Sequence, residues 1–364
     1  MKLSKTALYD FHISRQGKMV QFSGYSLPAY YTSINDEHTL VRSSVGLFDI
    51  SHMGEIVVSG LDAESFLQKV TINDIESIEV GQAQYTAMCN YDGGIVDDLI
   101  LYRNSDNYML VVNAGNINKN LNWLNKNKIG NVKVSNISDD ISIIAVQGPK
   151  SRSVLEMLTE ENLANIDFYS FVNGEVAGFD TMISRTGYTG ELGYELYLSS
   201  KNVVDVWRKL LKVGNDYGIA PVGLGCRDTL RMEMKYLLYG NDINETRNPI
   251  ESGLGWITKI NKGSFIGKEA ILNCKDNVQN KLVCIKMLDR AIPRKGLMIY
   301  KNEKLIGEIT SGTMSPSLGF GIGIGYVNVN YSNIGREIQI DVRGKLKKAV
   351  ILKPPFYKNG TLLQ

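Results

Sequence analysis

The segment YTAMCNYDGGIVDDLILYR, residues 85–103, predicts a β-hairpin that carries two adjacent carboxylates. Asp92, Gly93 and Gly94 are typical turn residues, and residues that favour strands flank them. Since side chains alternate between the two faces of a strand, the second strand divides its residues into two sets. These sets are Asp98, Ile100 and Tyr102 on one face, and Asp97, Leu99 and Leu101 on the other. One aspartate can therefore face a pocket while its neighbour does not; the plainer alternative is that both lie on the surface beyond the turn.

Ordered motifs on both sides of the hairpin extend the pattern over nearly the whole chain. They are GYSLP (24–28), GLFDISHMGE (46–55), SRTGYTGE (184–191), GYE (193–195), GLGCRD (223–228), YLLYG (236–240), FIGKEA (265–270) and GEITSG (307–312). Each motif alone is weak, but chance does not readily supply the ordered set with GGIVDDL (93–99) at its centre. On these motifs the chain resembles the glycine-cleavage T-protein, the folate-dependent aminomethyltransferase.

The length of 364 residues and the ordinary composition predict a globular protein of two or three domains. From about Asn280 the chain changes to short strands separated by Gly, Asn and Pro, which is typical of a small β-barrel. The expected strands are 281–287, 297–301, 305–310, 322–327, 339–342 and 347–352. The resemblance implies an α+β fold of three domains in a cloverleaf-like arrangement around a central pocket. Its domains would be 1–53 plus 138–275, 54–137, and 276–364; the sequence pattern alone gives only the last boundary.

Residue patterns for bound metals and nucleotide cofactors are missing. The four cysteines have no Cys-x-x-Cys spacing, and the three histidines have no His-x-x-x-His spacing, so reduced thiols are expected and His52 is expected to shape a loop. The glycine-rich stretches 263–269 and 319–325 fail the P-loop and dinucleotide patterns. We therefore expect no metal, no flavin and no nicotinamide cofactor.

The net charge of +2 does not indicate nucleic-acid binding, but the charge is unevenly distributed. From Lys281 onward there are 14 basic and 5 acidic residues, a balance of +9, against 26 basic and 33 acidic residues, or −7, before it. This is either a solvated face or a docking site for an acidic protein or polyanion. The amino terminus lacks the apolar core of a signal peptide and no stretch is long enough to span a bilayer, so a cytoplasmic protein, or the mature form of an organelle protein, is expected.

The resemblance assigns the substrate and its contacts. Tetrahydrofolate is the co-substrate, Glu195 and Arg227 are folate contacts, and three tyrosines surround the same ligand. These are Tyr188, Tyr236 and Tyr85, and the resemblance also assigns Asn113 and Met53 to the ligand site. From the residues alone, Glu195 and Arg227 would be read as a structural ion pair. The C-terminal stretch 353–364 has no arginine, so it lacks the residue with which the family contacts the ligand there.

Asp98 is the expected catalytic residue. The resemblance implies that a lipoylated H-protein presents an S-aminomethyl group, that ammonia leaves, and that 5,10-methylenetetrahydrofolate forms. An ionised Asp98 would stabilise the developing iminium, orient the folate N10, or act as a general base. Asp97 is expected to be structural. The alternatives are a folate-dependent demethylase of the same fold and a non-enzymatic folate-binding relative.

Overall fold

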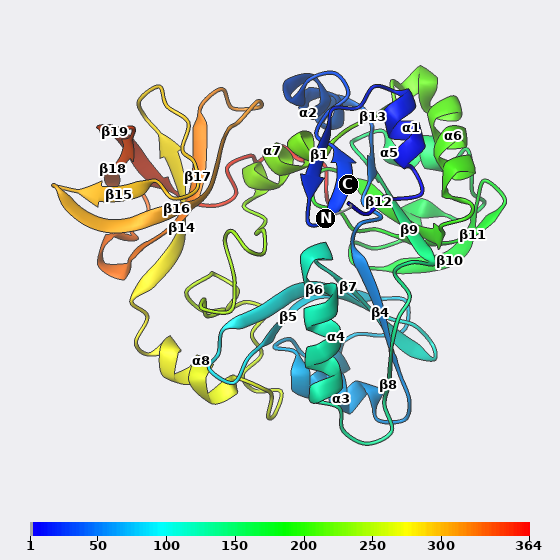
Figure 1. The fold of residues 1–364 in the computed structure, drawn as a ribbon, viewed down its shortest axis with the longest axis horizontal. Coiled ribbons are helices and arrows are strands. Elements are labelled where there is room, and N and C mark those ends of the chain that lie inside the picture. The colour runs from blue at the N-terminus through cyan, green and yellow to red at the C-terminus, as the bar shows by residue number, and fades with distance from the viewer. Residues whose placement is uncertain (1–2) are drawn as a thin grey trace.

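The chain folds into two sheets and a closed barrel, as a computed structural model of residues 3–364 describes it (Figure 1). The predicted α+β fold with a C-terminal β-barrel is therefore confirmed. A short hairpin and two helices precede the first sheet. They are α1 (Tyr9–Ser14), β1 (Met19–Phe22), β2 (Tyr25–Pro28) and α2 (Ile34–Ser43). No helix within residues 3–364 has the length and apolar character needed to cross a membrane.

The first sheet has six strands in the order β10-β11-β12-β9-β3-β13. Their bounds are β3 (Gly46–Asp49), β9 (Ile141–Gln147), β10 (Phe171–Val176), β11 (Phe179–Ser184), β12 (Gly193–Ser199) and β13 (Ala220–Pro221). Helices α5 (Ser151–Leu155) and α6 (Val203–Val213) follow strands of this sheet. The apolar positions of α6 recur every three or four residues, so Val203, Trp207 and Leu210 are all buried in one core with the sheet.

The second sheet contains the predicted hairpin and has the order β5-β6-β7-β4-β8. Its bounds are β4 (Gly54–Ser59), β5 (Ala83–Cys89), β6 (Ile95–Arg103), β7 (Asn107–Val112) and β8 (Lys133–Asn136), and the helices α3 (Ala63–Val70) and α4 (Ile117–Lys126) contribute to its core. The turn needs glycine, because Gly93 has a φ of +82° and a Cβ on Gly94 would lie 1.7 Å from the carbonyl oxygen of Glu245. The turn of the hairpin therefore packs closely against the segment around Glu245, which is distant in the sequence.

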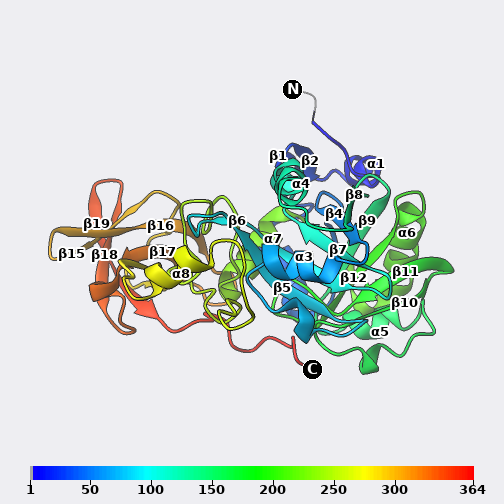
Figure 2. The same ribbon diagram turned by 90° about the horizontal axis from the view of Figure 1, so that it is seen from below.

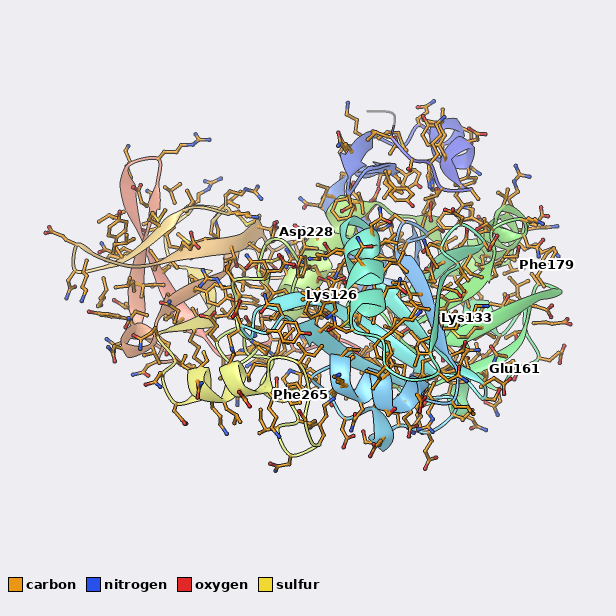
Figure 3. All side chains as sticks on the ribbon, turned by 60° about the horizontal axis from the view of Figure 1, so that its bottom comes forward. Lys126, Lys133, Glu161, Phe179, Asp228 and Phe265 are labelled. Atoms are coloured by element: carbon orange, nitrogen blue, oxygen red, sulfur yellow. The ribbon has the colours of Figure 1, made fainter. Side chains whose placement is uncertain are left out.

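Residues 224–275 connect the two sheets to the barrel. Helix α7 (Leu224–Met234) is followed by a long irregular segment and by α8 (Lys268–Lys275). One apolar cluster joins Cys89 of the hairpin, Ile243 of the irregular segment and Ile324 of the barrel. Asp228 of α7 lies at the junction between the barrel and the sheets (Figure 3). The precise domain boundaries, including the placement of residues up to 275 in the first domain, remain predictions.

The barrel contains the six strands that the sequence predicts. They are β14 (Asn280–Met287), β15 (Met298–Lys301), β16 (Lys304–Met314), β17 (Gly321–Asn328), β18 (Glu337–Val342) and β19 (Lys345–Leu352). Pairing of β14 with β19 closes the barrel. The remaining C-terminal residues run back from the barrel to the first sheet, where the Leu192 amide donates to the Thr361 hydroxyl (Figure 2). The tail therefore bridges two parts of the fold.

Candidate active site

Asp98 lies on strand β6 with a partly buried carboxylate that two side chains hold. The Tyr85 hydroxyl donates to Oδ2 at 2.9 Å, and the Asn113 amide donates to Oδ1 at 2.9 Å. Tyr85 comes from the first strand of the hairpin and Asn113 follows β7. Three neighbouring strands therefore fix the position of one carboxylate, and they place the predicted residues Asp98, Tyr85 and Asn113 together.

Asp97 points to the opposite face of β6 and is fully buried. Its carboxylate accepts hydrogen bonds from the side-chain amides of Asn113, Asn116 and Asn120, at 2.8, 2.7 and 2.5 Å. Asn120 lies within α4, so Asp97 ties the strand to that helix. Because side chains alternate along the strand, Asp97 is fully buried whereas Asp98, on the other face, is partly exposed.

Burial raises the pKa of both carboxyl groups. For Asp98, hydrogen bonds from Tyr85 and Asn113 oppose the effect of burial but leave the pKa above its ordinary value. For Asp97, burial and then the charge of Asp98 raise the pKa to about 7.

Glu195 extends from β12 and has only 6% of its surface exposed. Its Oε2 accepts hydrogen bonds from the Thr186 hydroxyl at 2.5 Å and from the Tyr197 hydroxyl at 3.4 Å. Burial raises the pKa of this carboxyl group, and the hydrogen bond from Thr186 and the charge of Arg227 lower it in part. Within residues 3–364, no side chain donates to the other oxygen, Oε1, which leaves it available to a ligand.

Arg227 lies in the first turn of α7. Its guanidinium carbon is 4.7 Å from the centre of the Tyr188 ring. In the described part of the chain, the guanidinium forms no ion pair within 4.0 Å and no side-chain hydrogen bond. The structural ion pair with Glu195, which the residues alone favour, is therefore not formed, and the donors of Arg227 are also available to a ligand.

Aromatic rings line the same region. Tyr188 stacks on Tyr236 with ring centres 5.6 Å apart, and the Tyr188 hydroxyl donates to the carbonyl oxygen of Leu237. Burial raises the pKa of Tyr188. The charges of Arg231 and Arg227 lower this pKa and the charge of Asp98 raises it, so Tyr188 interacts electrostatically with both Arg227 and Asp98. Met53 is partly buried against the apolar cluster that includes Cys226, the residue before Arg227.

Trp256 is a residue of this region that the sequence analysis does not identify. Its side chain is 64% exposed and stacks on Tyr85, with ring centres 6.2 Å apart and an angle of 27° between the rings. Because Tyr85 stacks on Trp256 and donates to Asp98, Tyr85 connects the exposed indole of Trp256 to the predicted catalytic carboxylate. No local sequence pattern marks Trp256, because its neighbour Tyr85 is 171 positions away along the chain.

His52 and the four cysteines lie outside any cluster that could hold a metal ion, among the residues that the structure describes. Burial and the charge of Arg227 lower the pKa of His52 to about 4, so the ring is neutral at pH 7. Phe22 and Tyr25 contact it edge-on. Cys89, Cys226 and Cys284 are buried, Cys274 is half-buried, and all four are free thiols. Across residues 3–364, no group of three or more His, Cys, Asp and Glu side chains could hold a metal ion.

Glu55 is a buried carboxyl group that the sequence analysis does not assign. It is 1% exposed, neither oxygen has a hydrogen-bond partner among residues 3–364, and burial raises its pKa to about 9. The folded protein therefore keeps a proton that the unfolded chain, with a pKa of 4.5, releases. The free energy of unfolding should fall as pH rises between these values, with a slope of up to about 1.4 kcal/mol per pH unit.

Glu55→Gln should remove this part of the pH dependence while preserving the shape of the side chain. Urea unfolding at several pH values between 7 and 9 measures it, and the difference between parent and variant isolates Glu55 from Asp97, which also titrates near pH 7. We expect a flatter profile in the variant. Equal slopes in the two proteins would show that Glu55 is already ionised in the folded state.

Comparisons with known proteins agree on one family. Residues 8–262 match the family described as the GCVT N-terminal domain, and residues 280–358 match the glycine cleavage T-protein C-terminal barrel domain. An aminomethyltransferase of Halothermothrix orenii is 48% identical, over 97% of this chain and 100% of the relative. One of Bacillus subtilis is 44% identical, over 98% and 99%. The crystal structure of the glycine cleavage system aminomethyltransferase T from Bartonella henselae matches with a TM-score of 0.93 and 32% identity, over 99% of both chains.

Proposed function

The chain belongs to the glycine-cleavage T-protein family and is a tetrahydrofolate-dependent aminomethyltransferase, and from this premise we propose that Asp98 is its catalytic carboxylate. The demethylase and the non-enzymatic relative are set aside, because the aminomethyltransferases match over the full chain. The position of Asp98 carries the proposal: its carboxylate is partly accessible and held by Tyr85 and Asn113, while its neighbour Asp97 is sealed.

The reaction moves one carbon between two carriers. The aminomethyl donor is the S-aminomethyl-dihydrolipoyl arm of the H-protein. Its C–S bond breaks, the nitrogen leaves as ammonia, and the carbon becomes the methylene bridge between N5 and N10 of tetrahydrofolate. The products are 5,10-methylenetetrahydrofolate and the reduced lipoyl arm. No oxidant is needed, because the carbon keeps its oxidation state.

Asp98 would act on the positive charge that develops along this path. An ionised carboxylate held by two donors is already oriented before reaction, so it can stabilise an iminium without reorganising. The same group can position N10 of the folate for attack. Asp97 would support this arrangement indirectly, since both aspartates accept hydrogen bonds from the Asn113 amide.

Glu195 and Arg227 would hold the folate. The amide and 2-amino edge of a pterin presents two adjacent donors, which suit a carboxylate, and Glu195 has one oxygen not used by Thr186 and Tyr197. Arg227 offers donors that the described protein leaves unused, and Tyr188, Tyr236 and Tyr85 supply ring faces for the aromatic parts of the ligand.

A reconstituted assay tests the proposed donor and acceptor. With glycine, the decarboxylating partner, lipoylated H-protein and tetrahydrofolate, the protein should form 5,10-methylenetetrahydrofolate and ammonia in equal amounts. Without H-protein, or with H-protein that lacks the lipoyl group, product should fall to the background level. Equal product with unlipoylated H-protein would contradict the proposed donor.

The basic segment from Lys281 onward contains the proposed docking surface for an acidic H-protein. Arg290, Arg294 and Lys295 are exposed on the segment between β14 and β15, and the Lys295 ammonium group donates to the carbonyl oxygen of Gly240, four residues after Tyr236, at 2.8 Å. We expect the association rate to fall as salt rises from 50 to about 500 mM, because the Debye length shortens to a few ångströms. Stopped-flow measurements at several salt concentrations check this prediction.

Charge reversal at Arg290, Arg294 and Lys295 should reproduce the loss of association at low salt. The matched control reverses Lys281, Lys304 and Lys353, which are exposed at the start of β14, at the start of β16 and just after β19, away from this segment. It changes net charge equally, so only a local effect distinguishes the two variants. An association rate that is insensitive to salt, or equal losses in both variants, would contradict this docking surface.

A further inference from the structure

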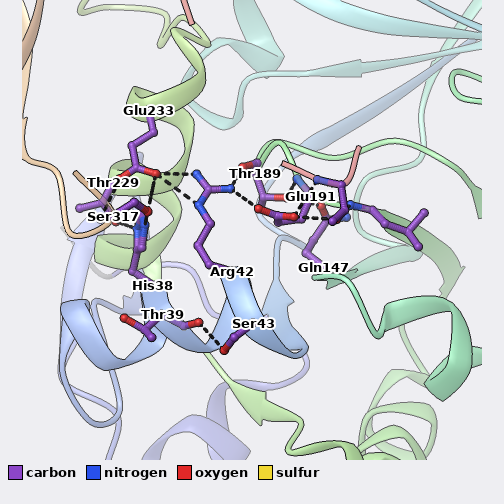
Figure 4. Close-up of polar contacts among 12 residues, drawn as sticks. His38, Thr39, Arg42, Ser43, Gln147, Thr189, Glu191, Thr229, Glu233 and Ser317 are labelled. Atoms are coloured by element: carbon purple, nitrogen blue, oxygen red, sulfur yellow. Dashed lines mark hydrogen bonds and ion pairs between the residues drawn. The ribbon is translucent and has the colours of Figure 1, made fainter. Parts of the chain in front are cut away.

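Arg42 of helix α2 is the centre of a buried polar cluster that lies outside the proposed catalytic site (Figure 4). Its Nη1 donates to Thr189 O and to Glu191 Oε1, each at 2.7 Å. Its Nη2 donates to Glu233 Oε2 at 2.7 Å, and its Nε donates to the same oxygen at 3.2 Å. Only 8% of the Arg42 side chain is exposed. One guanidinium therefore joins a loop after β11 to the end of α7.

The C-terminal tail closes one side of this cluster. Glu191 Oε2 accepts hydrogen bonds from the Thr361 amide at 2.9 Å and from the Thr361 hydroxyl at 2.6 Å. The ring of Tyr357 lies 4.0 Å from the Arg42 guanidinium carbon, where it shields the charge from water. The tail thus binds both Arg42 and one of its carboxylate partners.

The barrel closes the other side. Glu233 accepts hydrogen bonds from the Ser315 hydroxyl at 2.5 Å and from the Ser317 hydroxyl at 2.9 Å, and His38 lies 3.3 Å from it. Burial alone would raise the pKa of Glu233, but His38, Ser315 and Arg42 lower it to about 2. Glu233 is therefore an anion at every pH at which the enzyme would work, and Arg42 neutralises it within the protein.

The segments that Arg42 joins also carry the proposed folate contacts. Thr189 follows Tyr188 directly, and Glu233 is in the last turn of α7, whose first turn contains Arg227. Tyr236, which stacks on Tyr188, comes three residues after Glu233. A shift of the Thr189 loop relative to α7 would change the spacing of Tyr188, Tyr236 and Arg227 together.

We propose that Arg42 is a positioning residue, which fixes the Tyr188 loop against α7 and is itself held in place by the C-terminal tail. The inference rests on the proposed function, because it requires that Tyr188, Tyr236 and Arg227 contact the folate. It also gives the tail a role that needs no arginine: the tail acts on the site through Thr361, Tyr357 and Arg42 rather than through the ligand.

Two variants test the positioning role. Arg42→Lys keeps the charge but cannot donate to both carboxylates in the forked geometry of arginine. Thr361→Val removes the hydroxyl that donates to Glu191 with little change in volume, and it should fold even if Arg42→Lys does not. We expect the Kd and KM for tetrahydrofolate to rise about tenfold in Arg42→Lys and about threefold in Thr361→Val, while single-turnover rates at saturating folate change less than about threefold.

Arg152→Met is the matched control. Arg152 also binds the tail, since it donates to the Gln364 carbonyl oxygen at 3.2 Å, but it contacts Tyr194 rather than the Tyr188 loop. Its folate Kd should equal that of the parent. Parent-like folate affinity in Thr361→Val or in folded Arg42→Lys, or an equal loss in Arg152→Met, would overturn the positioning role. Failure of the parent itself to bind tetrahydrofolate would instead overturn the proposed function.

Discussion

Glu195→Gln is expected to weaken tetrahydrofolate binding by about a hundredfold. A carboxylate oxygen that accepts hydrogen bonds from the pterin donors contributes about 1.5–3 kcal/mol per charged hydrogen bond, and glutamine would present a donor in place of this free oxygen. The change is nearly isosteric, and Thr186 and Tyr197 can still donate to the amide oxygen. Equilibrium titration of tetrahydrofolate against the parent and the variant measures the effect.

A control on the same sheet separates ligand binding from general damage. Glu175 of β10 is exposed, so Glu175→Gln removes a charge from this sheet without touching the proposed site. We expect its folate affinity to match that of the parent. If Glu195→Gln binds folate as tightly as the parent while remaining folded, Glu195 is not the pterin contact.

Asp98→Asn should lower turnover by on the order of 10²–10³, the usual cost of losing one preorganised electrostatic group. Asparagine keeps the size of the side chain and can still accept the hydrogen bond from Tyr85. It loses the acceptor for the Asn113 amide at Oδ1, but that amide keeps its hydrogen bonds to Asp97 Oδ1 and to the Asp98 carbonyl oxygen, so the local geometry should survive while the charge is lost. Folate affinity should change much less, because Glu195, Arg227 and the tyrosines provide the binding contacts. Turnover at saturating substrates and a folate titration, made on the same preparation, separate the two effects.

Asp97→Asn is the adjacent control, and its expected effect is on stability. Three asparagine amides converge on the Asp97 carboxylate, so an amide at this position would place a donor against donors in a buried site. The midpoint of urea unfolding should fall, while the folded variant should turn over far faster than Asp98→Asn. Loss of turnover in Asp97→Asn with parent-like stability would show that Asp97, and not Asp98, is the catalytic aspartate.

The elements of this fold were predictable where local patterns specify them. The hairpin of residues 85–103 follows from turn glycines and alternating side chains, and the six barrel strands follow from short β-favouring runs between turn residues. The same alternation predicts that Asp97 and Asp98 face opposite ways. The sequence resemblance supplied the family, which the full-length relatives confirm.

The parts that were not predictable depend on contacts between distant segments. Arg42 and Glu233 are separated by 191 positions, and nothing local marks them as partners. The same holds for Trp256 over Tyr85 and for the tail against Glu191. The ion pair between Glu195 and Arg227 that the residues alone suggest does not form, because general rules about buried charges do not tell whether a partner is protein or ligand. Here Thr186, Tyr197 and the Tyr188 ring provide the contacts instead.

The pH dependence of the single-turnover rate tests the role of Asp98 most directly. Burial raises the pKa of Asp98, and the reactive form is the anion, so the rate should be low at acid pH and rise as pH passes through this raised pKa. With aminomethyl-loaded H-protein and saturating tetrahydrofolate, we expect this acid limb in the parent and in Asp97→Asn, and a slow rate with no such limb in Asp98→Asn. An acid limb of unchanged position and amplitude in Asp98→Asn would show that another group carries the charge.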